Sequence, residues 1–296
     1  SLYVKMKGEG SMKQKTRKPL GELNLLNRFL FGEVMEDSET YQGVLEIILG
    51  HEVNLRDNTQ SEKEIRTLPT FRGIRLDVWG QEEDGTIYNS EMQAFNTKNL
   101  PRRSRYYQSV LDAGLLEPGT IDFNHLANVY LITIAPFDLF GKRLCRYTFK
   151  MGCEEDDSLR LEDGAVRIFL NTRGEGDDRI SPELMAFLRY VEHSTKENAA
   201  AVDSLRLRKL HDRVQSVKGN EGIEVKYMQL WEEKAMERLE GRKEGRKEGR
   251  QEGEEYFAAL TERLLKDSRT EDLIKATSDK GFREVLYKEY GIKNQI

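Results

Sequence analysis

The stretch GIRLDVWGQEEDGTIYNSEMQ, residues 73–93, predicts two β-strands joined by a charged turn. In its first half apolar side chains recur at every second position, which is the period of a half-buried strand. Residues 82–85, EEDG, are a turn signal, and residues 86–93 resume an extended pattern. These residues therefore place two neighbouring strands at the centre of the predicted fold.

Three polar side chains fall on this strand pair. Asp77 is expected at the end of the first strand, and Glu91 and Gln93 share one face of the second, because strand side chains alternate between faces. Two adjacent carboxylates repel one another and lose hydration unless a cation or a proton lies between them. The pair therefore indicates a site that holds a cation or a proton.

Composition limits the kind of protein that carries this pair. The chain has 296 residues, 38% hydrophobic and 33% charged, which suits an α/β domain with an appendage. Its net charge of −5 gives the whole molecule no electrostatic attraction to nucleic acid, so local basic patches must provide any such binding.

Cysteine usage and apolar runs predict a cytoplasmic location. Cys145 and Cys153 lack CxxC spacing, which favours a reducing compartment, and with four scattered histidines they give no zinc motif. The longest apolar run, residues 129–135, is too short to cross a membrane, and the chain opens without a secretion leader. No membrane partner is expected.

Strands framed by helices over the first two thirds of the chain predict the α/β class. The expected parts are a flexible basic arm at 1–20, a domain with a helical end at 21–215, a charged glycine-repeat helix or spacer at 216–255, and a small helical piece at 256–296. Within the domain the predicted helices are 22–37, 38–50 and 100–116, and the further strands are 128–140, 143–151 and 164–171.

The repeat EGRKEGRKEGRQEGEE places glycines at every fourth position from Gly241 to Gly253. Four glycines inside a helix cost roughly 3–4 kcal/mol relative to alanine, so such a helix needs a compensating reason. A solvated spacer is favoured, because charge-rich segments are usually hydrated. The alternative is a helix whose glycine stripe packs closely on a partner chain, which would make the protein a homo-oligomer through its C-terminal region.

A metal site is the chemical interpretation of the strand pair. Mg²⁺ prefers carboxylate and water oxygens, often with a substrate phosphate, so Asp77 and Glu91 are candidate ligands. Gln93 can orient a water molecule or contact phosphate, but its amide carries no charge. On spacing alone, an exposed hairpin with polar residues is the preferred alternative.

Two neighbouring features favour the site. Glu46 is a lone acid in the apolar helix VLEIILG, and it is either a third metal-facing carboxylate or a residue at the helix edge. The helix at 100–116 carries Arg102, Arg103, Arg105 and Tyr107, a combination that suits a DNA phosphate backbone. Taken alone, that helix surface would be interpreted as merely solvated.

With these motifs, residues 24–174 resemble the Rpn-like branch of the PD-(D/E)XK nuclease superfamily, often labelled nuclease-family transposases of bacteria. The resemblance rests on IRLDVWG, YNSEMQ, RSRYYQS and YLITIAPFDLFG, and above all on D-x13-E-x-Q followed by the Arg/Tyr helix. It implies a restriction-endonuclease-like core, a central mixed β-sheet flanked by helices. It also implies a divalent metal and hydrolysis of DNA phosphodiesters.

By this resemblance Asp77 and Glu91 would be metal ligands, Glu46 the acid of the first core helix, and Gln93 the occupant of the superfamily's lysine position. A lysine there would stabilise the charge of the transition state, a contribution of roughly 2.7–4 kcal/mol for one preorganised group. The family pattern itself carries Gln at this position, so the resemblance implies either weak activity or compensation by a second metal or by Arg105. Replacing Gln93 by lysine is then expected to keep or raise activity.

Two functions follow as hypotheses. The leading one is a metal-dependent DNA endonuclease using Mg²⁺ or Mn²⁺, associated with recombination or transposition and catalytic through Asp77, Glu91 and Gln93. The alternative is a weak or inactive nuclease fold that acts as a DNA-binding or assembly module. A metal-free structural protein is disfavoured because it leaves the paired carboxylates without a role.

Overall fold

The computed structural model describes residues 17–65, 72–116, 119–176 and 178–292. Its centre is a six-stranded mixed sheet, ordered β1-β2-β3-β4-β6-β5. The strands are β1 (Gln60–Ile65), β2 (Ile74–Gln81), β3 (Ile87–Met92), β4 (Val129–Ala135), β5 (Arg146–Phe149) and β6 (Ala165–Asn171). β3, β4 and β6 run parallel, whereas β1, β2 and β5 pair antiparallel with their neighbours. The predicted fold class, α/β with a central mixed β-sheet, is confirmed.

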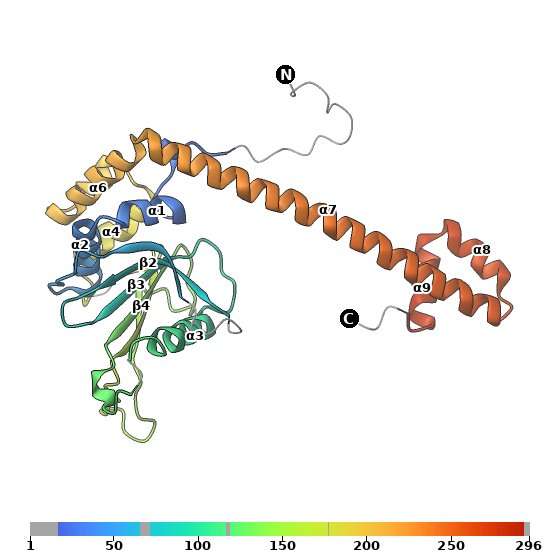
Figure 1. Cartoon of the computed structure of the whole chain (residues 1–296), viewed down its shortest axis with the longest axis horizontal. Helices are drawn as coiled ribbons and strands as arrows, with labels where there is room; N and C mark the ends of the chain where they lie inside the picture. Colours follow the sequence, from blue (N-terminus) through green and yellow to red (C-terminus); the bar gives the residue numbers. More distant parts are fainter. Residues whose placement is uncertain (1–16, 66–71, 117–118, 177, 293–296) are drawn as a thin grey trace. The chain divides into compact units, whose positions relative to one another are not determined.

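Helices cover both faces of this sheet (Figure 1). The helices of the domain are η1 (Leu20–Glu22), α1 (Arg28–Met35), α2 (Ser38–Leu49), α3 (Leu100–Asp112), η2 (Phe123–His125), α4 (Pro182–Glu192), α5 (Lys196–Ala199) and α6 (Leu205–Lys218). Helices α1, α2, α4 and α6 form one layer, and α3 lies on the opposite face, where it connects the parallel strands β3 and β4.

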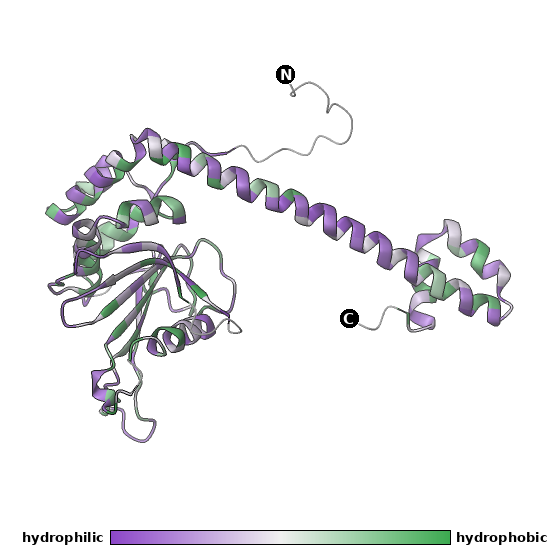
Figure 2. Ribbon diagram, in the orientation of Figure 1, coloured by the Kyte–Doolittle hydropathy of each residue, from purple (hydrophilic) through white to green (hydrophobic). Residues whose placement is uncertain are grey.

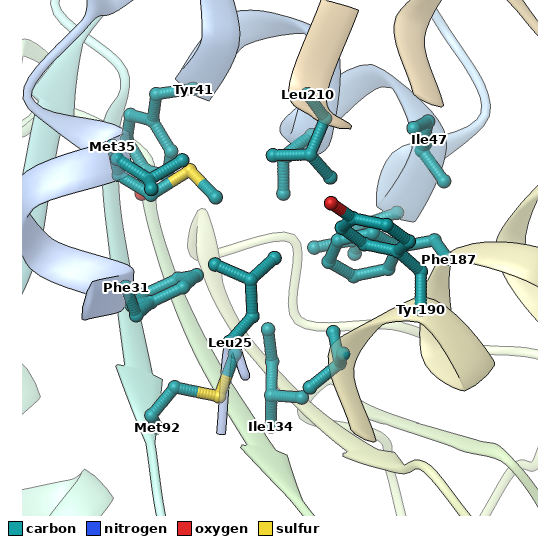
Figure 3. Close-up of a cluster of buried hydrophobic side chains, with 14 of the residues drawn as sticks. Leu25, Phe31, Met35, Tyr41, Ile47, Met92, Ile134, Phe187, Tyr190 and Leu210 are labelled. Atoms are coloured by element: carbon teal, nitrogen blue, oxygen red, sulfur yellow. The ribbon is translucent and has the colours of Figure 1, made fainter. Parts of the chain in front are cut away.

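The larger core lies between the sheet and the first helix layer. Phe31, Tyr41, Phe187 and Tyr190 come from three helices and belong to one buried cluster with Ile134 of β4 (Figure 3). Each of these side chains is essentially fully buried. On the other face Val110 and Leu111 of α3 pack with Trp79 and Leu131. Burial on two faces explains why β3 is buried along its whole length.

The two strands that open the sequence argument are more buried than expected, and β3 ends at Met92, one residue before Gln93. β2 runs from Ile74 to Gln81, so Asp77 is its fourth residue and not its end, which corrects the predicted placement. From Leu76 to Gly80 every residue is buried. The half-buried pattern was misleading here, because α3 covers the face that a two-layer fold would leave in water.

Strand β1, with the sequence QSEKEI, was not predicted. It lies at the edge of the sheet and pairs antiparallel with β2. Its residues are half-buried or exposed, so no apolar alternation marks it in the sequence. Charged side chains are common on edge strands because they discourage pairing with other chains. Glu62 within it has φ of 52°, a backbone conformation that a non-glycine residue seldom adopts.

The chain divides into two compact units, residues 1–227 and 228–296. The second begins within α7 (Glu221–Lys266), a single helix of 46 residues, and continues with α8 (Thr270–Ser278) and α9 (Lys280–Glu289). Leu260 and Leu264 of α7 pack with Leu286 and Tyr287 of α9 in a small separate core. The small C-terminal piece therefore packs on the end of α7 itself.

The glycine repeat lies inside α7. Residues 236–255 are all exposed, and Figure 2 shows the middle of this helix in hydrophilic colours. A Cβ added at any of the glycines from Gly241 to Gly253 would meet nothing within 4 Å. Of the expected basic arm at 1–20, residues 1–16 lie outside the described part of the chain. Among the described residues, no helix is both long and apolar enough to cross a membrane.

Candidate active site

Asp77 of β2 and Glu91 of β3 are neighbours at the end of the β2–β3 ladder, whose last pair is Val78 with Ser90. There an oxygen of the Asp77 carboxylate accepts a hydrogen bond from the backbone N–H of Met92, at 3.0 Å. Asp77 is 3% exposed and Glu91 is 7% exposed. The structure therefore brings two buried carboxylates together where adjacent strands meet.

Arg28 pairs with Asp77. Asn27 caps α1 by accepting hydrogen bonds from two backbone N–H groups of its first turn, and this fixes Arg28 as the first residue of the helix. The Arg28 Nε lies 2.5 Å from Asp77 Oδ1 and 3.3 Å from Glu62 Oε1. Glu62 lies on β1 between Ser61 and Lys63, which pair with Val78 and Leu76, and it also forms an ion pair with Arg75. A third carboxylate thus borders the site.

Arg103 pairs with Glu91 from the other side of the sheet. One nitrogen of its guanidinium, Nη2, donates to Glu91 Oε2 at 3.1 Å and to Gln93 Oε1 at 2.9 Å. The side-chain amide nitrogen of Gln93 in turn donates to the backbone carbonyl of Phe95 at 2.6 Å. The Tyr107 ring lies 5.7 Å from the guanidinium carbon of Arg103. Arg103 of α3 therefore hydrogen-bonds with its positively charged guanidinium to both polar residues of the E-x-Q motif.

The two carboxyl groups resist ionisation despite these arginines. Burial and the charge of Glu91 raise the pKa of Asp77 to about 7, although Arg28 and the Met92 amide favour the charged form. Burial likewise raises the pKa of Glu91, against the opposing effect of Arg103. Two buried carboxyls with raised pKa values form a site that a further cation would stabilise.

The donor set fits a hard divalent cation. Asp77 and Glu91 offer carboxylate oxygens, the ligands that Mg²⁺ and Mn²⁺ accept. Asn89, 1% exposed, has a side-chain oxygen without a hydrogen-bond partner, and it lines a cavity of about 10 Å³ with Glu91 and Tyr107, room for roughly one water molecule. Among the described residues no group of three His, Cys, Asp or Glu is arranged around one metal position, so water and phosphate would complete the coordination.

Glu46 lies elsewhere. Its carboxylate accepts from Arg206 Nε at 2.7 Å, which ties α2 to α6, and from the Val53 backbone N–H at 3.3 Å. It lines a groove of about 530 Å³ between these helices. Within the described part of the chain, its hydrogen bonds and ion pairs do not lead to Asp77 or Glu91. The structure therefore does not bring Glu46 to the paired carboxylates as expected.

The predicted DNA-binding residues of α3 divide into two groups. Arg102 and Arg105 are exposed and make no ion pair or side-chain hydrogen bond with any described residue. Arg103 is engaged with Glu91 and Gln93, and Tyr107 is half-buried against the core beneath α3. Two of the four side chains are therefore free to meet a phosphate backbone.

Sequence reasoning missed three residues of this site. Asn89 precedes Glu91 by two positions on a strand, so the alternation that paired Glu91 with Gln93 also indicates it. Arg28 follows an N-cap asparagine, but nothing in the sequence directs a helix-terminal arginine toward a particular strand. Glu62 lies on a strand without an apolar pattern, so no periodic signal marks it.

Comparison with known proteins gives one result. A family model described as PD-(D/E)XK nuclease family transposase matches residues 26–237, which is most of the chain and includes every residue of the site described above. No curated protein and no solved structure gives a significant match.

Proposed function

Because this chain belongs to the PD-(D/E)XK nuclease family transposases, we propose that it is a metal-dependent DNA endonuclease. Asp77 and Glu91 would form the active site at which it hydrolyses the phosphodiester bonds of DNA. The family membership supports a nuclease role associated with transposition, with DNA as the substrate. The observation that carries the finer proposal is the burial of two neighbouring carboxylates whose pKa values are raised.

In the proposed reaction, Asp77 and Glu91 would hold Mg²⁺ or Mn²⁺ beside the scissile phosphate. The bound metal would polarise a phosphate oxygen and ease deprotonation of the attacking water. In the hydrolysis itself, the water oxygen bonds to phosphorus and the phosphorus–oxygen ester bond breaks. The water gives up one proton to bulk solvent, and the departing oxygen takes one.

The surrounding residues prepare this site for an anion. Arg28 and Arg103 flank the carboxylates and offset their negative charge, which would otherwise repel DNA. Arg102 and Arg105 extend the positive charge along α3 into solvent. We propose that this helix follows the phosphate backbone, even though the whole chain has a net charge of −5.

Plasmid nicking in Mg²⁺, Mn²⁺ or EDTA tests the proposal, with wild type compared with Asp77→Asn. Wild type should nick with a divalent ion and not with EDTA. The variant should lose nicking and bind DNA as well or more tightly, because it lacks a ligand and a charge that repels phosphate. Asp203→Asn, at an exposed acid of another surface, is the matched control.

Two outcomes would contradict the proposal. Nicking by Asp77→Asn at the wild-type rate would remove the assigned role of the carboxylate pair. Measurable DNA binding without cleavage in any divalent ion would favour the second hypothesis, a non-catalytic DNA-binding or assembly module.

A further inference from the structure

The lysine position of the superfamily motif is held by Gln93, a neutral amide, yet a positive charge lies directly beside it. Arg103 Nη2 is 2.9 Å from the Gln93 amide oxygen and 3.1 Å from the Glu91 carboxylate. A guanidinium remains protonated at all ordinary pH values. The positive charge that the motif lacks at Gln93, directly after β3, is therefore supplied beside it by Arg103 of α3.

The contacts of Gln93 suit a residue that orients Arg103. Its oxygen accepts from the guanidinium, and its amide nitrogen is fixed at 2.6 Å from the Phe95 carbonyl, so the direction of the acceptor is set. A lysine at this position would offer no acceptor and would put a second cation against Arg103. The Gln93 amide thus fixes the position of the charged Arg103 guanidinium.

Arg103 also keeps donors for a substrate. Its two contacts use only Nη2, and Nε and Nη1 make no hydrogen bond with any described residue. A guanidinium has five N–H groups, so three remain for phosphate oxygens. The side chain is 29% exposed, whereas its partner Glu91 is 9% exposed, so Arg103 lies on the solvent side of the carboxylate.

We propose that Arg103 is a catalytic residue that replaces the superfamily lysine, and that Gln93 is its positioning residue. This inference rests on the proposed nuclease function. In the transition state of the hydrolysis described above, negative charge grows on the non-bridging phosphate oxygens, and a preorganised guanidinium stabilises that charge. Arginine suits this role because its planar donors match two phosphate oxygens at once.

A simpler role for Arg103 would be to neutralise Glu91 so that the metal site keeps its shape. The two roles differ in their response to metal. If Arg103 only supports Glu91, its loss weakens metal affinity, and excess Mg²⁺ restores the rate. If it stabilises the transition state, saturating Mg²⁺ restores nothing, and a small guanidinium compound in solution restores part of the rate.

The test measures single-turnover cleavage of a DNA duplex by wild type, Arg103→Ala and Arg103→Lys across a range of Mg²⁺ concentrations. Arg103→Ala should lower the rate at saturating DNA and Mg²⁺ by about 10²–10³-fold. Added guanidinium chloride at non-denaturing concentration should recover at least tenfold. Arg103→Lys should recover a smaller part. DNA affinity, measured separately in EDTA, should change less than tenfold.

Arg189→Ala, which removes an exposed arginine from α4, is the control for arginine loss and for guanidinium itself. A normal rate in Arg103→Ala, or a rate fully restored by excess Mg²⁺, would overturn this inference and leave the proposed nuclease intact. A wild-type protein without cleavage would overturn both. Gln93→Lys gives an independent check. The sequence alone predicts that it keeps or raises activity, whereas with Arg103 held by the Gln93 amide it should lower the rate. A faster Gln93→Lys enzyme would contradict the assignment.

Discussion

At Asp77, burial and the neighbouring Glu91 oppose ionisation, whereas Arg28 favours it, and the balance leaves the pKa at about 7. An unfolded aspartate titrates near 4, so the folded protein binds more protons than the unfolded chain between about pH 4 and pH 7. The contribution of this group to the free energy of unfolding therefore falls as pH rises through that window.

We expect Asp77→Asn to stabilise the metal-free protein relative to wild type more at pH 8 than at pH 5. The difference should be about 2–3 kcal/mol, because the buried charge that must form in wild type is absent from the variant. Urea unfolding in EDTA at the two pH values measures it. If the free energies of unfolding of variant and wild type differ by the same amount at both pH values, Asp77 does not titrate in this range.

Individual residues also show how far the sequence alone leads. The closeness of Asp77, Glu91 and Gln93 was predictable, because strand alternation relates residues on one strand and a short turn relates two strands; their catalytic role stays a prediction. The ion pair of Glu46 was not predictable, because a helix period indicates that a residue leaves the apolar face and does not say which neighbour it meets. Its partner Arg206 is 160 positions away along the chain.

At the scale of elements, α3 combines two tasks on one helix. Arg103 is directed toward β3, and Arg102 and Arg105 are directed into solvent. The amphipathic period predicted this helix and its basic side. It did not distinguish the arginine that serves the E-x-Q motif from the two that remain exposed.

Replacing Arg102 and Arg105 together by alanine should weaken DNA binding to a similar degree for all sequences. Removing one arginine–phosphate interaction should flatten the dependence of log K on log salt by about 0.9, so the double variant should have a slope that is shallower by nearly two units. Fluorescence anisotropy at several salt concentrations in EDTA measures this. An unchanged slope would make this part of α3 an ordinary solvated surface.

For the glycine repeat the sequence favoured a solvated spacer, and in the structure residues 236–255 are a continuous, exposed part of the helix α7. Because nothing lies within 4 Å of an added Cβ, alanine at Gly241, Gly245 and Gly249 should fit without strain. Each substitution should stabilise the helix by about 0.8–1.0 kcal/mol. Thermal unfolding monitored by circular dichroism at 222 nm measures the gain.

The same variants test the proposed homo-oligomer. If the glycine stripe packs closely on a partner chain, alanine would disrupt that packing, and sedimentation would show a smaller species. We expect the sedimentation behaviour to stay unchanged. Dissociation of an oligomer together with lower stability would instead support close packing through the glycines.

At the scale of the whole molecule, the two compact units have separate cores. Leu264 is fully buried in the C-terminal core, so Leu264→Ala should destabilise that unit by about 2–5 kcal/mol. Limited proteolysis should then cut α8 and α9 sooner, while divalent-dependent nicking continues. Leu45→Ala, in the main core, is the comparison variant and should reduce both stability and nicking.

The open glycines of α7 also have a consequence for how its length can change over time. Its repeating unit is four residues, so an insertion or deletion of whole units would add or remove one tetrad at a time and keep the reading frame. Each tetrad would lengthen the helix by about 6 Å and rotate its far end by roughly 40°. Because these turns contact nothing within 4 Å of the glycine Cβ positions, such a change would leave both cores untouched. The helix is therefore a segment whose length can mutate in fixed steps without passing through a misfolded form.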